Sequence, residues 1–447
     1  MHSAKTSRLK DKIQKIIESS LSPITDFVVL RGNDLLARDK GDIDVLVPNS
    51  YCLKACQAFI RLGERDGWRV LYFRNIRYLA QVVLCQALSN EETLAVKVDF
   101  FGGLEWYGVG SGKITERLFS KVLSWQSSAS EYDAIVGAIN FLQKSMTVGR
   151  LAKRDVSRAI AYGASPKYIF KTAKTLRLPL NIKEAESGRL TWSKKWRLRF
   201  ASSSPVNTSS FIFWLIQIIY VHLRFKSRLC TGSGLIISIS GLDGSGKSTQ
   251  FKRLINAYKT GGGPPVKTLH FLPRWIPLPH QMLNRGKTSQ NYGRPYSEAP
   301  TTSTLSGMSR LAYYFSAFFI TKISLSLSAK RGAVIIIDRS FADFAVDPLR
   351  ARIPFPSLHK GLLRACTLKG CNLFIDVLPE TSVSRKDELS FEKATSLRSN
   401  YLSIFKTLGG YVVDGDDSEA DVFNRILNHI HEIYVSRIVQ MVEATIV

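Results

Sequence analysis

A stretch just past the middle of the chain, SISGLDGSGKSTQ, has glycines, a lysine and hydroxyl residues at the spacing of a phosphate-binding loop. Four residues satisfy the pattern G-x-x-x-x-G-K-[ST]: Gly241, Gly246, Lys247 and Ser248. An apolar run (LIISIS) precedes the loop and a helix-like segment (STQFKRLINAYK) follows it, so backbone N–H groups and a helix N-terminus can surround phosphate oxygens. The pattern predicts a nucleoside triphosphate site in which Lys247 contacts the β- and γ-phosphates and Ser248 ligates Mg²⁺. Three further loop residues are expected to contact the nucleotide: Gly244, Ser245 and Thr249.

The loop also contains a carboxylate, Asp243. A negative charge at this place would repel the nucleotide phosphates unless it points elsewhere, for instance at a hydroxyl of an acceptor. We therefore include Asp243 among the candidate catalytic residues. The loop pattern alone does not distinguish a kinase from a GTPase or an ATPase.

Upstream, the sequence GDIDVLV places two carboxylates, Asp42 and Asp44, at a spacing of two. This spacing puts both side chains on the same side of a strand. Two like charges so close are costly unless a divalent cation joins them, so Mg²⁺ is expected there in a two-metal-like site. Arg31 and Arg38 could assist with phosphate.

The elements that must position these residues divide the chain into three regions. Its 447 residues are too many for one ordinary core, and the composition, 45% hydrophobic and 22% charged, is globular rather than disordered or fibrous. We expect a mixed strand and helix domain over 1–125, in which FVVLRG and DIDVLV form paired strands and TLAVKVDFF forms another strand. A basic helical connector is expected over 126–228. After residue 229, continuous apolar strands alternate with helical patterns, which indicates an α/β domain with a parallel sheet covered on both faces.

The formal net charge of +26 suits polyanionic partners such as nucleotides, nucleic acid or an anionic membrane, although a solvated basic face would give the same charge. The scattered cysteines and the polar start favour a reduced, cytoplasmic protein, and no run of about 18 apolar residues predicts a membrane span. Residues 211–223, FIFWLIQIIYVHL, lie between basic clusters. They are interpreted either as a buried inter-domain helix or as a peripheral membrane contact.

From Leu235 to Tyr434 the sequence resembles the thymidylate kinase superfamily. Its phosphate loop is similar to GLDGSGKST, and AVIIIDRSFADFAVDP is similar to its Asp-Arg motif at a strand end. LFIDVLPETSVSRKDE resembles the next strand and lid, and YVVDGDDSEADVFNRILNHI resembles the last strand, the loop near the adenine and the last helix. The resemblance implies a P-loop kinase domain with a five-stranded parallel sheet that uses ATP and Mg²⁺.

Carried onto this sequence, the resemblance implies that Asp338 holds Mg²⁺ or its waters and that Arg339 faces the acceptor phosphate or the transferred group. Arg385, from the lid, would neutralise charge that develops during transfer. Further lid candidates are Lys386 and Arg398. Alternatively Asp338 only caps a strand, and two lid cations only pair with the acids that follow them: Arg385 and Lys386 with Asp387 and Glu388.

The acceptor side departs from the family. Asp-Arg-Tyr reads Asp-Arg-Ser, with Ser340 in the third place, and a Pro-rich stretch over 271–300 replaces the family's acceptor segment. Arg310 is the only arginine near the start of the next helix. The chain is thus similar to a divergent branch of the superfamily, associated with bacterial surface polysaccharides, in which the acceptor need not be a nucleotide.

VVLRGNDLLARDKGDIDVLV resembles the nucleotidyltransferase fold of the polymerase-β type, which would make the first domain an α+β nucleotidyltransferase-like unit. The resemblance implies a glycine turn at Gly32 and three metal-binding carboxylates, Asp42, Asp44 and Asp99. Asn33 stands where that family has serine. An active nucleotidyltransferase, a relic that binds a ligand or partner, and an unrelated α/β domain all remain open.

These observations lead to a kinase with ATP and Mg²⁺, whose default acceptor is dTMP and whose alternative acceptor is a sugar or glycan. Two rivals remain. A nucleic-acid end-modifying enzyme would suit the positive charge, but no nucleic-acid module is recognised, so nucleic acid is not the expected partner. A regulatory NTP switch would not need the acceptor-side residues.

Overall fold

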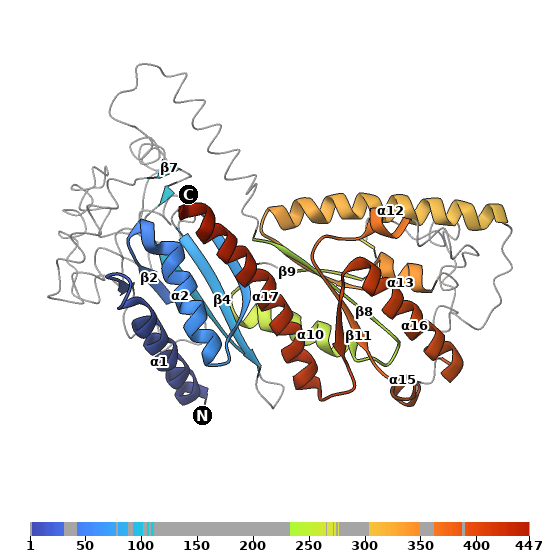
Figure 1. Ribbon diagram of the computed structural model, residues 1–447, viewed down its shortest axis with the longest axis horizontal. Coiled ribbons are helices and arrows are strands. Elements are labelled where there is room, and N and C mark those ends of the chain that lie inside the picture. Colours follow the sequence, from blue (N-terminus) through green and yellow to red (C-terminus); the bar gives the residue numbers. More distant parts are fainter. Residues whose placement is uncertain are drawn as a thin grey trace, which may run out of the picture.

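The computed structural model describes residues 2–30, 43–110, 233–276, 304–347 and 362–446, with short breaks at 77–78, 88–92, 102–104, 107–108, 265, 271, 274–275 and 387–388. Two five-stranded sheets form two modules that lie side by side (Figure 1). The predicted connector over 126–228, the apolar stretch over 211–223 and most of the Pro-rich acceptor stretch lie outside the described residues. The predicted domain boundaries therefore stay predictions.

The N-terminal module contains helices α1 (His2–Leu21) and α2 (Cys52–Arg65), with the short turn η2 (Asn49–Tyr51) before α2. Its strands are β1 (Val28–Leu30), β2 (Ile43–Leu46), β3 (Arg69–Ile76), β4 (Leu79–Ala87) and β5 (Thr93–Phe101). They pair in the order β1-β2-β5-β4-β3, and only β2 with β5 is parallel. β6 (Glu105–Trp106) and β7 (Val109–Gly110) form a separate ribbon. The expected pairing of the first two strands is confirmed.

The C-terminal module has an all-parallel sheet in the order β12-β11-β8-β10-β9. Its strands are β8 (Leu235–Gly241), β9 (Val266–His270), β10 (Val334–Asp338), β11 (Cys371–Asp376) and β12 (Tyr411–Asp414). Its helices are α10 (Lys247–Thr260), α12 (Thr304–Lys330), α13 (Phe341–Val346), α15 (Pro379–Arg385), α16 (Phe391–Leu408) and α17 (Glu419–Ile446). The predicted five-stranded parallel sheet is confirmed, and every residue of the central strand β8 is buried, as its continuous apolar pattern indicates.

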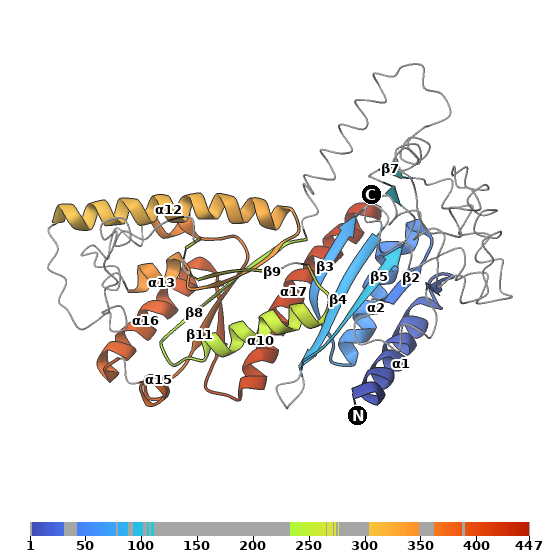
Figure 2. The ribbon, with the colours of Figure 1, turned by 180° about the vertical axis from the view of Figure 1, so that it is seen from behind.

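The two modules share one hydrophobic core, because α17 and α10 belong to the second sheet but pack on the first. α17 lies along β3, the edge strand of the N-terminal sheet, where His431 Nδ1 accepts a hydrogen bond from the Val70 N–H at 3.0 Å. Figure 2 shows α10 running from the C-terminal sheet toward β4 and β5. A Cβ atom at Gly261 would lie 2.6 Å from Val83, so the helix end needs a residue without a side chain.

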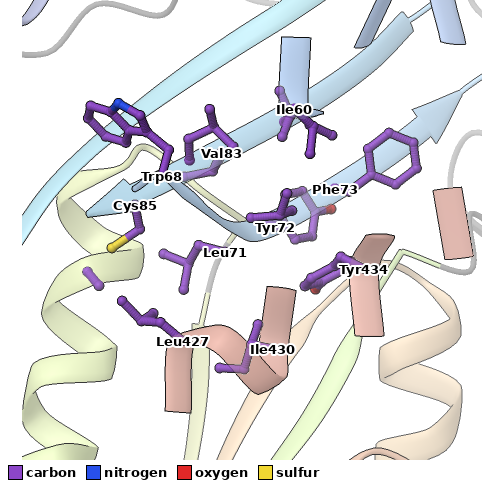
Figure 3. Packing of buried hydrophobic residues seen from close by; sticks show 14 of the residues in the cluster. Ile60, Trp68, Leu71, Tyr72, Phe73, Val83, Cys85, Leu427, Ile430 and Tyr434 are labelled. Carbon is purple, nitrogen blue, oxygen red and sulfur yellow. The ribbon is translucent and has the colours of Figure 1, made fainter. Parts of the chain in front are cut away.

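Large buried side chains fill the space between the modules (Figure 3). Tyr72 and Tyr434 meet edge to face, with ring centroids 6.2 Å apart, and the Tyr258 hydroxyl donates to the Leu71 carbonyl at 2.9 Å. Leu427 and Ile430 of α17 complete the same cluster. An apolar contact of this kind stabilises one arrangement of the modules over others.

Helix α12 departs from the expectation that the chain has no segment able to span a membrane. By length and composition alone it is long and apolar enough, with a mean hydropathy of 1.2 over its best 18-residue window. Serines are interspersed among the apolar residues of this helix, so no uninterrupted apolar run in the sequence predicted it. Leu311, Phe318 and Leu325 of α12 are buried against the C-terminal module.

Candidate active site

The phosphate loop joins β8 to α10 and needs glycine at three positions. Gly244 and Gly246 have φ angles of 90° and 84°, in the left-handed region that favours glycine. At Gly241 and Gly244 a Cβ atom would lie 2.7 Å from the carbonyl oxygens of Ile375 and Ser382. The backbone therefore curls tightly at the N-terminus of α10, where N–H groups can face an anion.

Lys247 lies inside the loop with 6% of its surface exposed. Its Nζ donates to the carbonyl of Gly241 at 2.8 Å and to the carbonyl of Leu242. Burial lowers the pKa of Lys247 to about 8, with a smaller contribution from the charge of Arg339. The ammonium is thus held close to the loop and would exchange these carbonyls for phosphate oxygens.

Asp243 and Arg339 form a buried ion pair at the edge of the loop. The Arg339 guanidinium donates to an Asp243 carboxylate oxygen, and the Asp243 carbonyl accepts from the Ser382 hydroxyl at 2.7 Å. Burial would lower the pKa of Arg339, but the carboxylates of Asp343 and Asp243 outweigh it and raise the pKa above its ordinary value. Asp243 was expected to face an acceptor hydroxyl, but its carboxylate faces the Arg339 guanidinium instead.

Arg339 also has an unusual backbone, with φ at 69°, the only positive φ among the described residues other than glycine. Left-handed backbone at a bulky residue is strained and persists only where the surroundings fix it. The residues on both sides provide that: Asp338 ends β10, and Ser340 caps α13. From this backbone the Arg339 side chain reaches the loop, where it contacts Asp243.

Asp343 is a buried anchor that the sequence analysis missed. Its carboxylate accepts from the Ser240 hydroxyl at 2.6 Å, from the Ser340 N–H at 2.7 Å and from the Tyr401 hydroxyl at 2.8 Å. These donors come from β8, from the turn after β10 and from α16. The Ser-x-x-Asp capping box formed by Ser340 and Asp343 was the sequence signal that could have identified it.

Asp338 lies beside His270 at the carboxyl ends of β10 and β9, where the two residues are in register. Their Oδ2 and Nδ1 atoms are 2.9 Å apart. Burial would raise the pKa of Asp338, but the hydrogen bond and charge of His270 and the charge of Arg339 lower it. Asp338 is therefore held as a carboxylate. His270, which the sequence analysis did not select, is its neighbour.

Apart from Gly241 at the end of β8, the predicted residues of the C-terminal site meet in one cleft of about 650 Å³. It is lined by the loop from Asp243 to Gln250 and by further residues: His270, Asp338, Arg339, Arg385, Lys386, Gly415, Asp417, Glu419 and Val422. The loop lining includes Gly244, Ser245, Ser248 and Thr249. Arg398 does not line it, because its guanidinium binds both carboxylate oxygens of Asp376 at 2.7 and 2.9 Å. Asp387 and Glu388, the alternative partners of the lid cations, lie outside the described residues.

The donor set of the cleft fits Mg²⁺. The hydroxyl of Ser248 and the carboxylate of Asp338 both line it, and oxygen atoms are the ligands that this ion prefers. Among the described residues, no group of three or more His, Cys, Asp or Glu side chains could hold a metal by itself. A nucleotide-bound Mg²⁺ needs fewer protein ligands, because phosphates and water complete its shell.

In the N-terminal module, Asp44 and Asp99 occupy paired positions on the parallel strands β2 and β5, and each is 5% exposed. Asp99 contacts the Lys97 ammonium at 3.1 Å and the Gln81 amide at 2.9 Å. The structure thus brings two of the three predicted metal carboxylates together, with a lysine beside one of them. Five residues of this prediction lie outside the described part of the chain: Arg31, Gly32, Asn33, Arg38 and Asp42.

Comparison with solved structures finds thymidylate kinases. Thymidylate kinase from Candida albicans is 21% identical over 45% of this chain and 93% of its own, with a TM-score of 0.33. Thymidylate kinase from Ehrlichia chaffeensis is 20% identical over 45% of this chain and 98% of its own, with a TM-score of 0.30. No protein-family model matches the sequence. No curated protein matches it either.

Proposed function

We propose that the protein is a Mg²⁺- and ATP-dependent phosphotransferase of the nucleoside monophosphate kinase type, with dTMP as the default acceptor and dTDP as the product. The observation that supports it is the ion pair between Asp243 and Arg339. The pair holds Arg339 in the same cleft as the phosphate loop, where its guanidinium can bind the phosphate of an acceptor.

Each residue of the cleft then has a separate task. Lys247 moves from the loop carbonyls to the β- and γ-phosphate oxygens, and Ser248 and Asp338 hold Mg²⁺, which neutralises phosphate charge when bound. Arg339 positions the acceptor phosphate. Arg385, at the end of α15, stabilises the charge of the transferred group.

The reaction is a displacement in line at the γ-phosphorus. An oxygen of the acceptor phosphate forms the new bond to phosphorus, and the bond from phosphorus to the β,γ-bridging oxygen breaks, so that ADP leaves. A phosphate monoester is mostly a dianion at neutral pH, so its attacking oxygen needs little help from a general base. The cleft supplies cations for this charge, Lys247, Arg339 and Arg385, next to carboxylates such as Asp338.

The test is transfer of labelled phosphate from ATP to a panel of acceptors: dTMP, other nucleoside monophosphates, sugars, glycolipids and oligonucleotides. Lys247→Ala is the inactive control. Labelled dTDP supports the proposal, whereas transfer to a sugar or glycolipid points to polysaccharide assembly. Two outcomes contradict a nucleoside monophosphate acceptor: transfer to oligonucleotide ends, and nucleotide binding without transfer to any acceptor.

A further inference from the structure

Helix α12 presents a row of large apolar side chains to solvent. The members of the row are 43% to 79% exposed: Leu305, Met308, Phe319, Ile320, Ile323 and Leu327. At about 100° per residue these positions fall on one side of the helix. In Figures 1 and 2, α12 lies along one edge of the C-terminal module, and its C-terminal end reaches the junction with the N-terminal module.

The row is not needed for folding of the module. The opposite side of α12 carries its own buried residues, Leu311, Phe318 and Leu325, which pack on the module. A soluble protein does not usually leave an apolar patch of this size in water without a use for it. The buried side also excludes a spanning arrangement, because α12 would have to leave the sheet to cross a bilayer.

Among the described residues, the charges of α12 and of the turn that follows it are all positive. The described helix contains Arg310, Lys322 and Lys330 and no acidic residue, and Arg331 follows it. On one flank, Lys267 of β9 donates to the Ser328 hydroxyl at 3.3 Å. The row therefore lies among cations rather than among mixed charges.

On the other flank a pocket of about 440 Å³ opens beside Lys322. Its lining includes Arg364 and Lys369, and among the described residues it includes no acid. This end of the sheet is opposite the nucleotide cleft, since Gly370 and Lys369 precede β11 whereas the phosphate loop follows β8. The pocket is thus separate from the nucleotide cleft, and its charged side chains are all basic.

We propose that α12 docks the protein on an anionic membrane surface, with its apolar row in the interface and the neighbouring cations on lipid phosphates. An amphipathic helix that lies in the interface combines these two features, an apolar side and flanking lysines or arginines. A second copy of the chain is a poorer occupant. Two such helices packed row to row would bring together elements whose charges are all positive, whereas anionic headgroups neutralise them.

The experiment is flotation of the full chain with vesicles of phosphatidylcholine, alone or mixed in equal parts with phosphatidylglycerol. We expect binding to the mixed vesicles only. Ile320→Gln with Ile323→Gln should weaken it more than about tenfold, because two interfacial side chains are lost. Lys330→Gln with Lys369→Gln should weaken it roughly 25-fold, about fivefold for each lysine.

Two controls change an exposed β-branched aliphatic residue and a lysine elsewhere: Val412→Gln, 40% exposed on β12, and Lys259→Gln at the end of α10. Both should float like the unmodified protein. The proposal is wrong if the unmodified protein does not bind the mixed vesicles, or if the double isoleucine variant floats equally well. If deletion of 211–223 alone abolishes flotation, that segment makes the membrane contact and the proposal for α12 is wrong. The unmodified protein could instead be a dimer that dissociates in the double isoleucine variant while flotation stays unchanged. That result would show that a second copy covers the row.

Discussion

Arg339 and Asp243 are joined by an ion pair although they lie 96 residues apart in the chain. Asp243 belongs to the phosphate loop and Arg339 follows the neighbouring strand β10, so the pair ties the nucleotide side of the cleft to the side where an acceptor would enter. Arg339 is held in a strained backbone conformation while it makes this contact. Asp243 and the surrounding backbone therefore hold Arg339 in the cleft.

Asp243→Asn should weaken acceptor recognition more than nucleotide binding. The substitution removes the charge that positions Arg339, and a hydrogen bond to a charged group contributes about 1.5–3 kcal/mol. We expect the acceptor KM to rise roughly ten- to hundredfold. The affinity for Mg·ATP should stay equal or increase, because a negative charge leaves the loop. Steady-state kinetics and calorimetry measure the two effects, and Glu443→Gln, an exposed carboxylate near the C-terminal end of α17, is the control. Equal losses in both quantities would contradict the assignment.

Nucleotide binding should depend on the protonation of Lys247. The folded protein holds the pKa of this lysine at about 8, below its ordinary value of 10.5. Phosphate binds the ammonium form, so affinity for Mg·ATP should fall about tenfold per pH unit as pH rises above 8. The unfolded chain binds this proton more tightly than the folded protein does. The free energy of unfolding of the ligand-free protein should therefore increase as pH rises from about 8 to 10.5.

Lys247→Arg is the matched variant for that titration, because a guanidinium stays charged throughout. Calorimetry across pH 8 should show a flatter profile for the variant, even if its affinity is lower. A profile as steep as that of the unmodified protein would mean that another group titrates.

Asp343→Asn should destabilise the C-terminal module and also disturb the acceptor side. The amide cannot accept from all three donors that surround it, so we expect a loss of about 1–3 kcal/mol in the free energy of unfolding. Tyr401→Phe removes a single donor and should cost about 1 kcal/mol. Denaturant unfolding gives both values. Thr395→Val, exposed on the same helix as Tyr401, is the control. A purely structural role for Asp343 would leave the acceptor KM unchanged, whereas positioning of Arg339 through Ser340 should raise it.

The junction between the modules should weaken in acid because of His431. Burial lowers its pKa below the ordinary 6.5, although Glu64 and Glu432 oppose the shift. The neutral ring accepts a hydrogen bond from the Val70 N–H. Because the unfolded chain takes up a proton on this ring more readily than the folded protein, the free energy of unfolding should decrease as pH falls through 6.5. Thermal unfolding as a function of pH measures this. His431→Gln keeps an acceptor without titrating and should flatten the profile; His429→Gln accounts for the neighbouring histidine, whose pKa burial also lowers.

Asp99→Asn should destabilise the N-terminal module by about 1–3 kcal/mol, because it leaves the Lys97 ammonium beside a neutral group in a mostly buried place. Adding Lys97→Met should recover most of the loss. Denaturant unfolding of the single and double variants gives the comparison. Asp42→Asn with Asp44→Asn tests the chemistry separately: unchanged turnover of every nucleoside triphosphate would leave the site a relic.

Much of the C-terminal module could be predicted from sequence because its signals are local. The spacing from Gly241 to Ser248 defines the phosphate loop, and continuous apolar runs predict strands buried on both faces. The same logic identified β5 and the pairing of β1 with β2. Each of these features depends on neighbours within a few residues, or on one periodicity.

Which charged groups meet was decided only by the tertiary structure. The contacts of Asp243 with Arg339, of Asp343 with Tyr401 and of His270 with Asp338 follow from the order in which the strands lie, which residue spacing does not encode. The same holds for Arg398, a lid candidate by sequence that binds Asp376 instead. It also holds for α17, whose sequence shows a helix but not the sheet edge it covers. Local patterns fix what each segment becomes, whereas packing of one buried surface on another fixes which segments become neighbours.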